Sequence, residues 1–299
     1  VHFQWLANRE QDCAFMKLLS RMGIPSVYTA HDVEPHLTAS AKDRAELGKL
    51  YGAAAKVIVH AESNKKELVK VFGIPEAKVA VIPHGSYDFL CALEPVSRDA
   101  ARKKIGIPES KKVVLFFGLI KRYKGLEYLV EAFQEVRSRL ETAFLLIVGD
   151  IYAGDAQSHR FYSQMIESLR GRDDVLCVAS YVPVESVSQY LSAADVVVLP
   201  YTRTYQSGVL LAAYAAGRPV VVTNTGGLAE VVEEGESGFV VPPEDARALA
   251  NAIVDILSDS GRLDAMGRRA RHLATAVYGW EAIAAKTIEL YRSVLGEAA

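Results

Sequence analysis

Residues 113–136 read VVLFFGLIKRYKGLEYLVEAFQEV, and the fold class can be predicted from their pattern. Its opening run is apolar, β-branched and aromatic up to Gly118, which is typical of a strand buried on both faces of a parallel sheet. Further on, apolar side chains stand at the spacing of one helix face, at Leu126, Leu129, Val130, Phe133 and Val136. The stretch therefore predicts a strand, a basic turn bounded by glycines, and a helix.

The same alternation of apolar runs and helical patterns extends over almost the whole chain. The predicted strands cover residues 1–4, 26–30, 56–60, 78–83, 113–118, 144–149, 175–178, 195–200, 219–223 and 238–241. This order predicts a doubly wound α/β fold with right-handed crossovers. The alternation of strands and helices is interrupted once, over residues 85–112. Glycines, prolines and lysine pairs there predict an interdomain connection.

We therefore expect two Rossmann-like parallel-sheet domains. The first covers residues 1–94, the second covers 95–277, and a helix over 278–299 could pack back on the first. The first domain has four predicted strands, fewer than the usual six or so of a full dinucleotide-type sheet. The chain also opens on apolar residues without an initiator methionine. We expect the first domain to be incomplete at its upstream end.

Composition excludes several classes of protein. The chain has 299 residues, 50% of them hydrophobic, and 34 basic against 36 acidic residues give a net charge of −2, so no nucleic-acid partner is expected. Three scattered cysteines match no metal-binding pattern and fit a reducing cytoplasm. No apolar run is long enough to span a membrane. Lysine pairs at 65–66, 103–104 and 111–112 leave peripheral contact with the inner membrane face open.

The basic turn after strand 113–118 is the first candidate site. Gly118 lets the backbone turn, and Lys121, Arg122 and Lys124 lie within four residues, directly before a helix whose first amides are free. Together these features suit a phosphate-sized anion. A solvated basic turn is the alternative interpretation.

Two further strand ends in the second domain resemble the first. After strand 195–200, Ser207 could cap a helix or contact a phosphate, and Gly208 and Val209 offer backbone amides. After strand 219–223, the pair Gly226-Gly227 opens a short helix. Each feature alone is explained equally well by local structure, but three of them in one domain favour a ligand that carries a diphosphate.

Histidines follow two strands of the first domain. His31 stands just after strand 26–30, where it could reach a ligand held by the second domain, although a structural histidine is the alternative. His84, after strand 78–83, could belong to the hinge between the two domains or could line the ligand cleft. The sequence contains no phosphate-binding loop of the Walker type, no dinucleotide fingerprint opening the first domain and no nucleophile elbow.

Taken in order, the motifs resemble glycosyltransferase family four over nearly the whole chain. They are Thr29-Ala30-His31-Asp32, Val81-Ile82-Pro83-His84-Gly85, the turn from Gly118 to Gly125, Leu146-Ile147-Val148-Gly149-Asp150, the run from Ala194 to Pro200, Gly217-Arg218-Pro219-Val220-Val221, and Gly226-Gly227 with Glu230. The resemblance implies a GT-B fold, in which two Rossmann-like domains face a cleft. It also implies retaining transfer of a sugar from a nucleotide-sugar donor.

The resemblance also assigns roles by position. Lys124 matches the family lysine that holds the donor diphosphate, and Lys121 or Arg122 would replace the family arginine, whose position holds Leu119. The two glutamates typical of the family fall at Thr204 and Ala212, so Gln206 is a candidate for the donor sugar. The resemblance implies catalytic roles for His31, Lys124 and Gln206, and donor-binding roles for Gly118, Lys121, Arg122, Lys124, Tyr181, Val182, Ser207, Gly208 and Val209, with Tyr181 and Val182 near the nucleotide base.

The leading hypothesis is a retaining hexosyltransferase that needs no metal and no cofactor besides its nucleotide-sugar substrate. Its acceptor would be a glycan or a lipid-linked sugar, as in polysaccharide biosynthesis. Two alternatives stay open. A non-catalytic nucleotide-sugar-binding or partner subunit would explain the missing glutamates, and a phosphorylase or epimerase of the same fold would act on other sugar phosphates.

Overall fold

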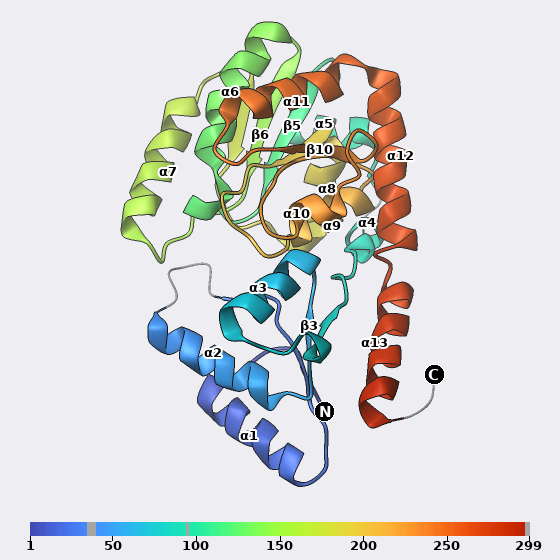
Figure 1. Cartoon of the computed structure of the whole chain (residues 1–299). Coiled ribbons are helices and arrows are strands. Elements are labelled where there is room, and N and C mark those ends of the chain that lie inside the picture. Colours follow the sequence, from blue (N-terminus) through green and yellow to red (C-terminus); the bar gives the residue numbers. More distant parts are fainter. Residues whose placement is uncertain (35–39, 94–95, 297–299) are drawn as a thin grey trace. The chain divides into compact units, whose positions relative to one another are not determined.

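The computed structural model describes residues 1–34, 40–93 and 96–296 (Figure 1). The chain forms two compact units. Unit 1 contains the described parts of 1–85, 204–206 and 280–299, and unit 2 contains those of 86–203 and 207–279. The predicted boundary between residues 94 and 95 lies outside the described residues. The helix from 280 onward belongs to unit 1.

Unit 1 is built on a four-stranded parallel sheet with the order β1-β2-β3-β4. The strands are β1 (His2–Phe3), β2 (Val27–Thr29), β3 (Lys56–Val59) and β4 (Val79–Val81). The helices are α1 (Arg9–Arg21), α2 (Ala41–Ala53), α3 (Glu62–Phe72) and α13 (Trp280–Leu295), with a short 3-10 helix, η1 (Glu76–Lys78). The strands are shorter than the apolar runs that predicted them, but their number and order along the chain agree with the sequence analysis.

The two faces of this sheet pack against different helices because side chains alternate along a strand. Val57 and Val59 of β3 join one core with residues of α1, α2 and α3, and α1 lies beside α2 (Figure 1). Ile58, on the opposite face of β3, packs with Val27, Ile82 and Ile283 of α13. Helix α13 therefore closes the second face of the unit 1 sheet.

Unit 2 is built on a six-stranded parallel sheet with the order β10-β9-β8-β5-β6-β7. The strands are β5 (Lys112–Phe117), β6 (Ala143–Val148), β7 (Val175–Val178), β8 (Val196–Leu199), β9 (Val220–Thr223) and β10 (Gly238–Val241). The helices are α4 (Asp88–Leu93), α5 (Arg98–Ile105), α6 (Leu126–Arg139), α7 (Ala156–Leu169), α8 (Val184–Ala193), α9 (Gly208–Ala215), α10 (Leu228–Val231), α11 (Ala246–Ser258) and α12 (Ser260–Ala276), with the 3-10 helix η2 (Arg122–Lys124). All six predicted strands of the second domain are present.

Strand β5 lies inside this sheet and is buried on both faces. Val114 and Phe116 join the core formed with α6, α7 and α11, and Figure 1 shows α6 and α11 side by side. Val113 and Leu115 join the opposite core, formed with α8 and α9. This two-sided burial explains why the run 113–117 is continuously apolar.

The predicted connection over 85–112 is only partly irregular, and this is a difference from the sequence analysis. It contains α4 and α5, and both helices pack on α8. Arg102 of α5 is buried and donates to the carboxylate of Asp195 at 2.6 Å, while the backbone amide of Val113 donates to the same oxygen. A buried charge is stable only when it is paired, so this contact fixes α5 against the start of β8.

The strand order places a topological switch point in unit 2. The chain runs from β5 outward to β6 and β7, then returns to the other side of β5 with β8. In open α/β sheets, ligands bind beyond the carboxyl ends of the strands at such a point. None of the helices within the described ranges is long and apolar enough to cross a bilayer.

Candidate functional site

The carboxyl ends of β5 and β6 meet without side chains between them. Gly118 follows β5 and Gly149 follows β6, and the amide of Gly118 donates to the carbonyl of Val148. A methyl group built on Gly149, where φ is 142°, would lie 2.2 Å from the carbonyl oxygen of Gly118. Only glycine fits at position 149, and the close approach leaves backbone exposed at this edge of the sheet.

The basic turn is fixed against the end of β8. A methyl group on Gly125, where φ is 64°, would lie 2.0 Å from the carbonyl oxygen of Pro200, so the turn packs backbone to backbone on the residue after β8. The amide of Thr202 donates to the carbonyl of Tyr123 at 2.8 Å. These contacts hold η2 at the switch point between β5 and β8.

Lys124 is the buried cation of this turn. Its side chain is 9% exposed, and Nζ lies 5.2 Å from the centroid of the Tyr201 ring. No carboxylate of the described residues lies within ion-pair distance of it. Because a buried charge without a partner is costly, the arrangement favours an anion as the missing partner of Lys124.

The N-terminus of α9 lies beside the same strand end. A methyl group built on Gly118 would lie 3.0 Å from Nζ of Lys124 and 3.5 Å from Cγ2 of Val209. Ser207 occupies the N-cap position, but its side chain makes no capping hydrogen bond. The first amides of α9 have no partner within the helix. Lys124 and the start of α9 therefore lie together beside Gly118, and their predicted binding of an anion stays a prediction.

The other two cations of the turn lie elsewhere. Lys121 places Nζ 4.3 Å from the centroid of the Tyr152 ring. Arg122 is exposed and lines a separate cavity of about 170 Å³ with residues of α6 and α7, namely Glu127, Gln157, Ser158, Phe161 and Tyr162. Their predicted donor-binding roles stay predictions.

Tyr181 and Val182 follow β7, at the edge of the unit 2 sheet. Tyr181 is 77% exposed, whereas Val182 packs on the core beside α8. Their predicted contact with a nucleotide base is not tested by this arrangement.

Unit 1 carries a row of histidines at the carboxyl ends of its strands. His31 follows β2, His60 follows β3 and His84 follows β4. Nε2 of His60 lies 3.0 Å from Nδ1 of His31, and the rings of His60 and His84 have centroids 5.3 Å apart. His84 lies beside Trp280 of α13, so this residue of the predicted hinge packs within unit 1.

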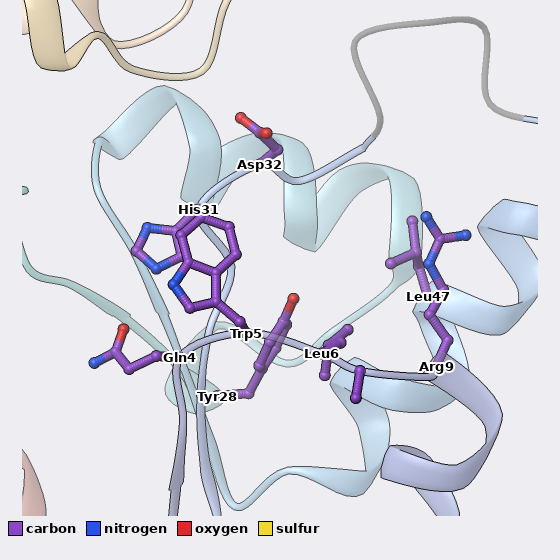
Figure 2. Close-up of a pocket in the computed structure, with 9 residues that line it drawn as sticks. Gln4, Trp5, Leu6, Arg9, Tyr28, His31, Asp32 and Leu47 are labelled. Atoms are coloured by element: carbon purple, nitrogen blue, oxygen red, sulfur yellow. The ribbon is translucent and has the colours of Figure 1, made fainter. Parts of the chain in front are cut away.

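His31 also lines a pocket of about 380 Å³ in unit 1 (Figure 2). The indole of Trp5 stacks on the His31 ring with centroids 4.4 Å apart, although Trp5 itself is 76% exposed. Arg9 and Leu47 lie at the other end of the pocket, and Arg9 is paired with Asp43 at 2.8 Å. The pocket combines an aromatic surface with polar groups, as ligand sites do.

Gln206 belongs to unit 1 together with Thr204 and Tyr205. Tyr205 is buried in the unit 1 core, and its hydroxyl donates to Glu67 of α3 at 2.9 Å. Thr204 donates to the carbonyl of Gln206, while Oε1 of Gln206 is buried without a hydrogen-bond partner among the described residues. The predicted sugar contact of Gln206 stays a prediction.

Burial sets the electrostatics of the histidine row. It lowers the pKa of His60 to about 4, against a weaker opposing effect of the hydrogen bond to Ile82. Burial also lowers the pKa of His31, with the neighbouring His84 as the next largest cause. Both rings are therefore neutral at pH 7.

His60 is the site residue that sequence reasoning missed. The signal was present, because residues 56–60 were predicted as a strand ending in histidine, like the strand before His31. Two histidines that follow neighbouring parallel strands meet at one edge of the sheet. No cluster of three or more metal-binding side chains occurs in the described part of the chain.

Two family models match the chain in the regions just described. The model described as Glycosyltransferase Family 4 matches residues 9–86, and the model described as Glycosyl transferases group 1 matches residues 111–259. The first lies within the residue range of unit 1 except for its last residue, 86, and the second lies within that of unit 2 except for the short segment 204–206.

Individual relatives extend over more of the chain. An uncharacterized glycosyltransferase from Methanocaldococcus jannaschii is 31% identical over 241 residues, which cover 80% of this chain and 60% of that protein. A D-inositol 3-phosphate glycosyltransferase from an Arthrobacter species is 30% identical over 289 residues, covering 93% of this chain and 68% of the relative. The chain spans about 60% of the length of the first curated relatives that it matches.

A solved structure shares the fold. HepE from Anabaena in complex with UDP has a TM-score of 0.83 at 22% identity, covering 96% of this chain and 77% of that one. These matches confirm the fold and the family predicted from the ordered motifs. The chain has the GT-B fold and belongs to glycosyltransferase family 4.

Proposed function

We propose that unit 2 binds a nucleotide-diphosphate sugar and that the chain acts in transfer of a hexosyl group to a glycan or lipid-linked acceptor. The observation that carries this proposal is Lys124, a buried cation without a carboxylate partner among the described residues, beside Gly118 and the N-terminus of α9. A diphosphate supplies the anion that this arrangement lacks.

The proposed chemistry is a transfer with retention at the anomeric carbon. The bond between that carbon and the diphosphate oxygen breaks, negative charge grows on the diphosphate, and the acceptor oxygen forms the new bond on the same face. The acceptor hydroxyl gives its proton to the departing diphosphate. Lys124 and the amides of Gly208 and Val209 would stabilise the growing charge, which is the usual source of most catalytic power in such sites. We propose that no metal ion takes part.

The structural relatives support the choice of donor. HepE has been solved with UDP and with UDP-glucose. By analogy, we propose a uridine diphosphate sugar as the first donor to test here, with the base near Tyr181 and Val182.

A non-catalytic binding function is the competing proposal. It is favoured by Thr204 and Ala212, which stand where the family resemblance implies glutamates and provide no carboxylate. Thr204 uses its hydroxyl to donate to a backbone carbonyl, and Ala212 is buried in α9. Donor hydrolysis or sugar transfer by the protein distinguishes catalysis from binding alone.

A thermal-shift comparison tests donor binding directly. We expect UDP-glucose to raise the melting temperature of the chain, because a ligand at 100 times its dissociation constant stabilises the folded state by about 2.7 kcal/mol. GDP-glucose and ADP-glucose serve as base controls. If none of the three nucleotide sugars raises the melting temperature, the proposal that this chain binds a nucleotide-sugar donor is wrong.

A further inference from the structure

Unit 2 has a hollow at the amino ends of its strands. The hollow has a volume of about 270 Å³ and lies between the residues that precede β8 and β9 and one side of α12. Gly118 and Gly149, by contrast, follow the carboxyl ends of β5 and β6. Because all the strands of this sheet are parallel, the two places lie at opposite edges of it. The hollow is therefore separate from the strand ends beside Lys124.

Two glycines bring α12 close to the turn that precedes β9. A methyl group built on Gly267 of α12 would lie 2.6 Å from the carbonyl oxygen of Gly217, so the two segments pack backbone to backbone. The φ angle of Gly217 is 66°, a region that favours glycine. Arg271 stands one helical turn after Gly267, and its Cδ lies 3.7 Å from a methyl group built on Gly217. This contact holds Arg271 at the hollow.

Positive charge exceeds negative charge around the hollow. Two of the charged lining residues are aspartates and four are arginines, namely Asp195, Asp264, Arg98, Arg218, Arg268 and Arg271. Oδ2 of Asp195 accepts from Arg102 and from the amide of Val113, both at 2.6 Å. Its other oxygen lies 3.4 Å from Arg98. One carboxylate is thus shared by two guanidinium groups and cannot neutralise both.

Arg268 and Arg271 of α12 have no carboxylate partner. Neither forms an ion pair in the part of the chain that the structure describes, although Asp264 stands four positions before Arg268. Arg269, between them, is paired with Glu233 at 2.6 Å. Like charges repel, and more strongly where protein replaces water. An anion in the hollow would turn this repulsion into attraction.

We propose that this hollow binds a phosphate group through Arg98, Arg268 and Arg271. A guanidinium group is planar and donates two parallel hydrogen bonds to a phosphate. Small-molecule pockets usually measure about 300–1,000 Å³, so this smaller hollow suits inorganic phosphate or a compact phosphorylated molecule. A phospholipid headgroup carries the same chemistry. The proposal is independent of the proposed function.

Solvated surface arginines are the alternative interpretation. Arg268 and Arg271 are exposed, and exposed charges interact weakly because water and salt screen them. Screening depends on ionic strength alone, so chloride and phosphate would then have equal effects at equal ionic strength. A binding site, by contrast, distinguishes phosphate from chloride.

Titration of the ¹⁵N-labelled chain with inorganic phosphate tests binding. We expect the amide resonances of Gly217 and Gly267 to shift until they saturate, with sodium chloride keeping the ionic strength constant. The amide of Gly118 reports any phosphate bound beside Lys124, so the two events are distinguished by residue. Resonances of Gly217 and Gly267 that do not shift, or that shift equally with added chloride, overturn the proposal.

Variants of the two exposed arginines test their part in binding. In a double variant with Arg268→Gln and Arg271→Gln, we expect the phosphate affinity reported by Gly217 to fall by about 10-fold or more. Lysine keeps the charge but not the fork of donors, so the Arg→Lys double variant is expected to lie in between. The control is Arg160→Gln on α7, a helix that contributes nothing to the hollow. Wild-type affinity in the glutamine double variant contradicts the proposal.

Melting temperatures separate binding from a structural role. We expect phosphate to raise the melting temperature of the wild type more than that of the glutamine double variant, because only the wild type keeps the site. A purely structural role of the arginines would lower the melting temperature of the variant equally in chloride and in phosphate. Equal increments from phosphate in the two proteins therefore overturn the site.

Sedimentation with vesicles identifies the source of the phosphate group. One set of vesicles contains phosphatidylcholine alone, and the other also contains phosphatidic acid. Sedimentation of the wild type with the second set, lost in the glutamine double variant, assigns the hollow to a lipid headgroup. Binding of inorganic phosphate without sedimentation assigns it to a soluble ligand. If neither probe distinguishes the wild type from the double variant, the proposal is wrong.

Discussion

Replacing Lys124 with methionine is expected to lower the turnover of sugar transfer by roughly 10²–10³-fold, the usual effect of removing one preorganised charge-stabilising group. Methionine keeps the unbranched apolar stem of the buried side chain but removes the ammonium group over Tyr201. The loss is largest in the transition state, where the diphosphate carries most charge. Initial rates with UDP-glucose measure the loss of transition-state stabilisation. The affinity for UDP, from calorimetry, measures the loss of binding in the ground state.

A matched variant controls for the loss of any lysine. Lys103 is exposed on α5, away from the strand ends that form the site, so Lys103→Met removes the same charge without touching the anion site. We expect its rate and UDP affinity to equal those of the wild type. Equal rates for Lys124→Met and the wild type would remove Lys124 from the mechanism.

Unit 1 is expected to lose stability between pH 7 and pH 4. The pKa of His60 is depressed in the folded state, so the unfolded chain binds more protons in this window and the free energy of unfolding falls as the pH falls. The displacement of that pKa from 6.5 to about 4 corresponds to at most about 3 kcal/mol. The stabilisation is complete above pH 7 and is lost by about pH 4. His31 and His2, whose pKa values burial also lowers, act in the same direction.

Urea unfolding at several pH values measures this effect in unit 1 alone. The two tryptophans of the chain, Trp5 and Trp280, both belong to unit 1, so their fluorescence reports on its unfolding. His60→Gln removes the largest titrating contribution, and we expect a clearly smaller loss of stability between pH 7 and pH 4. A wild-type unfolding free energy that is constant over this range would contradict the burial of neutral histidines.

The fold and the family could be predicted because their signals are local and repeated. Continuous apolar runs such as 113–117 require burial on both faces, and the ordered strand ends carry the family motifs. The helices within residues 85–112 were harder to predict. They are short, and the glycines, prolines and lysine pairs around them are typical of a linker. Its helices are fixed by tertiary contacts such as Arg102 with Asp195, which lie 93 positions apart.

The different surroundings of the three cations in the basic turn could not be predicted from the sequence. Three cations within four residues look equivalent in sequence, yet η2 buries Lys124 against Tyr201 and leaves Arg122 exposed beside α7. The burial of Lys124 rather than Arg122 depends on the close packing of Gly125 on Pro200, which is a contact between segments distant in sequence. The contact between His31 and His60 likewise depends on sheet register, since the two rings meet because β2 pairs with β3.

A crystal structure of the chain with UDP-glucose tests whether Lys124 and the start of α9 hold the donor diphosphate. We expect the diphosphate to lie beyond the carboxyl end of β5, within hydrogen-bond distance of Nζ of Lys124 and of the first amides of α9. A diphosphate held elsewhere, with Lys124 and the amides of Gly208 and Val209 making no contact to it, would contradict the assignment of this anion site to the sugar donor.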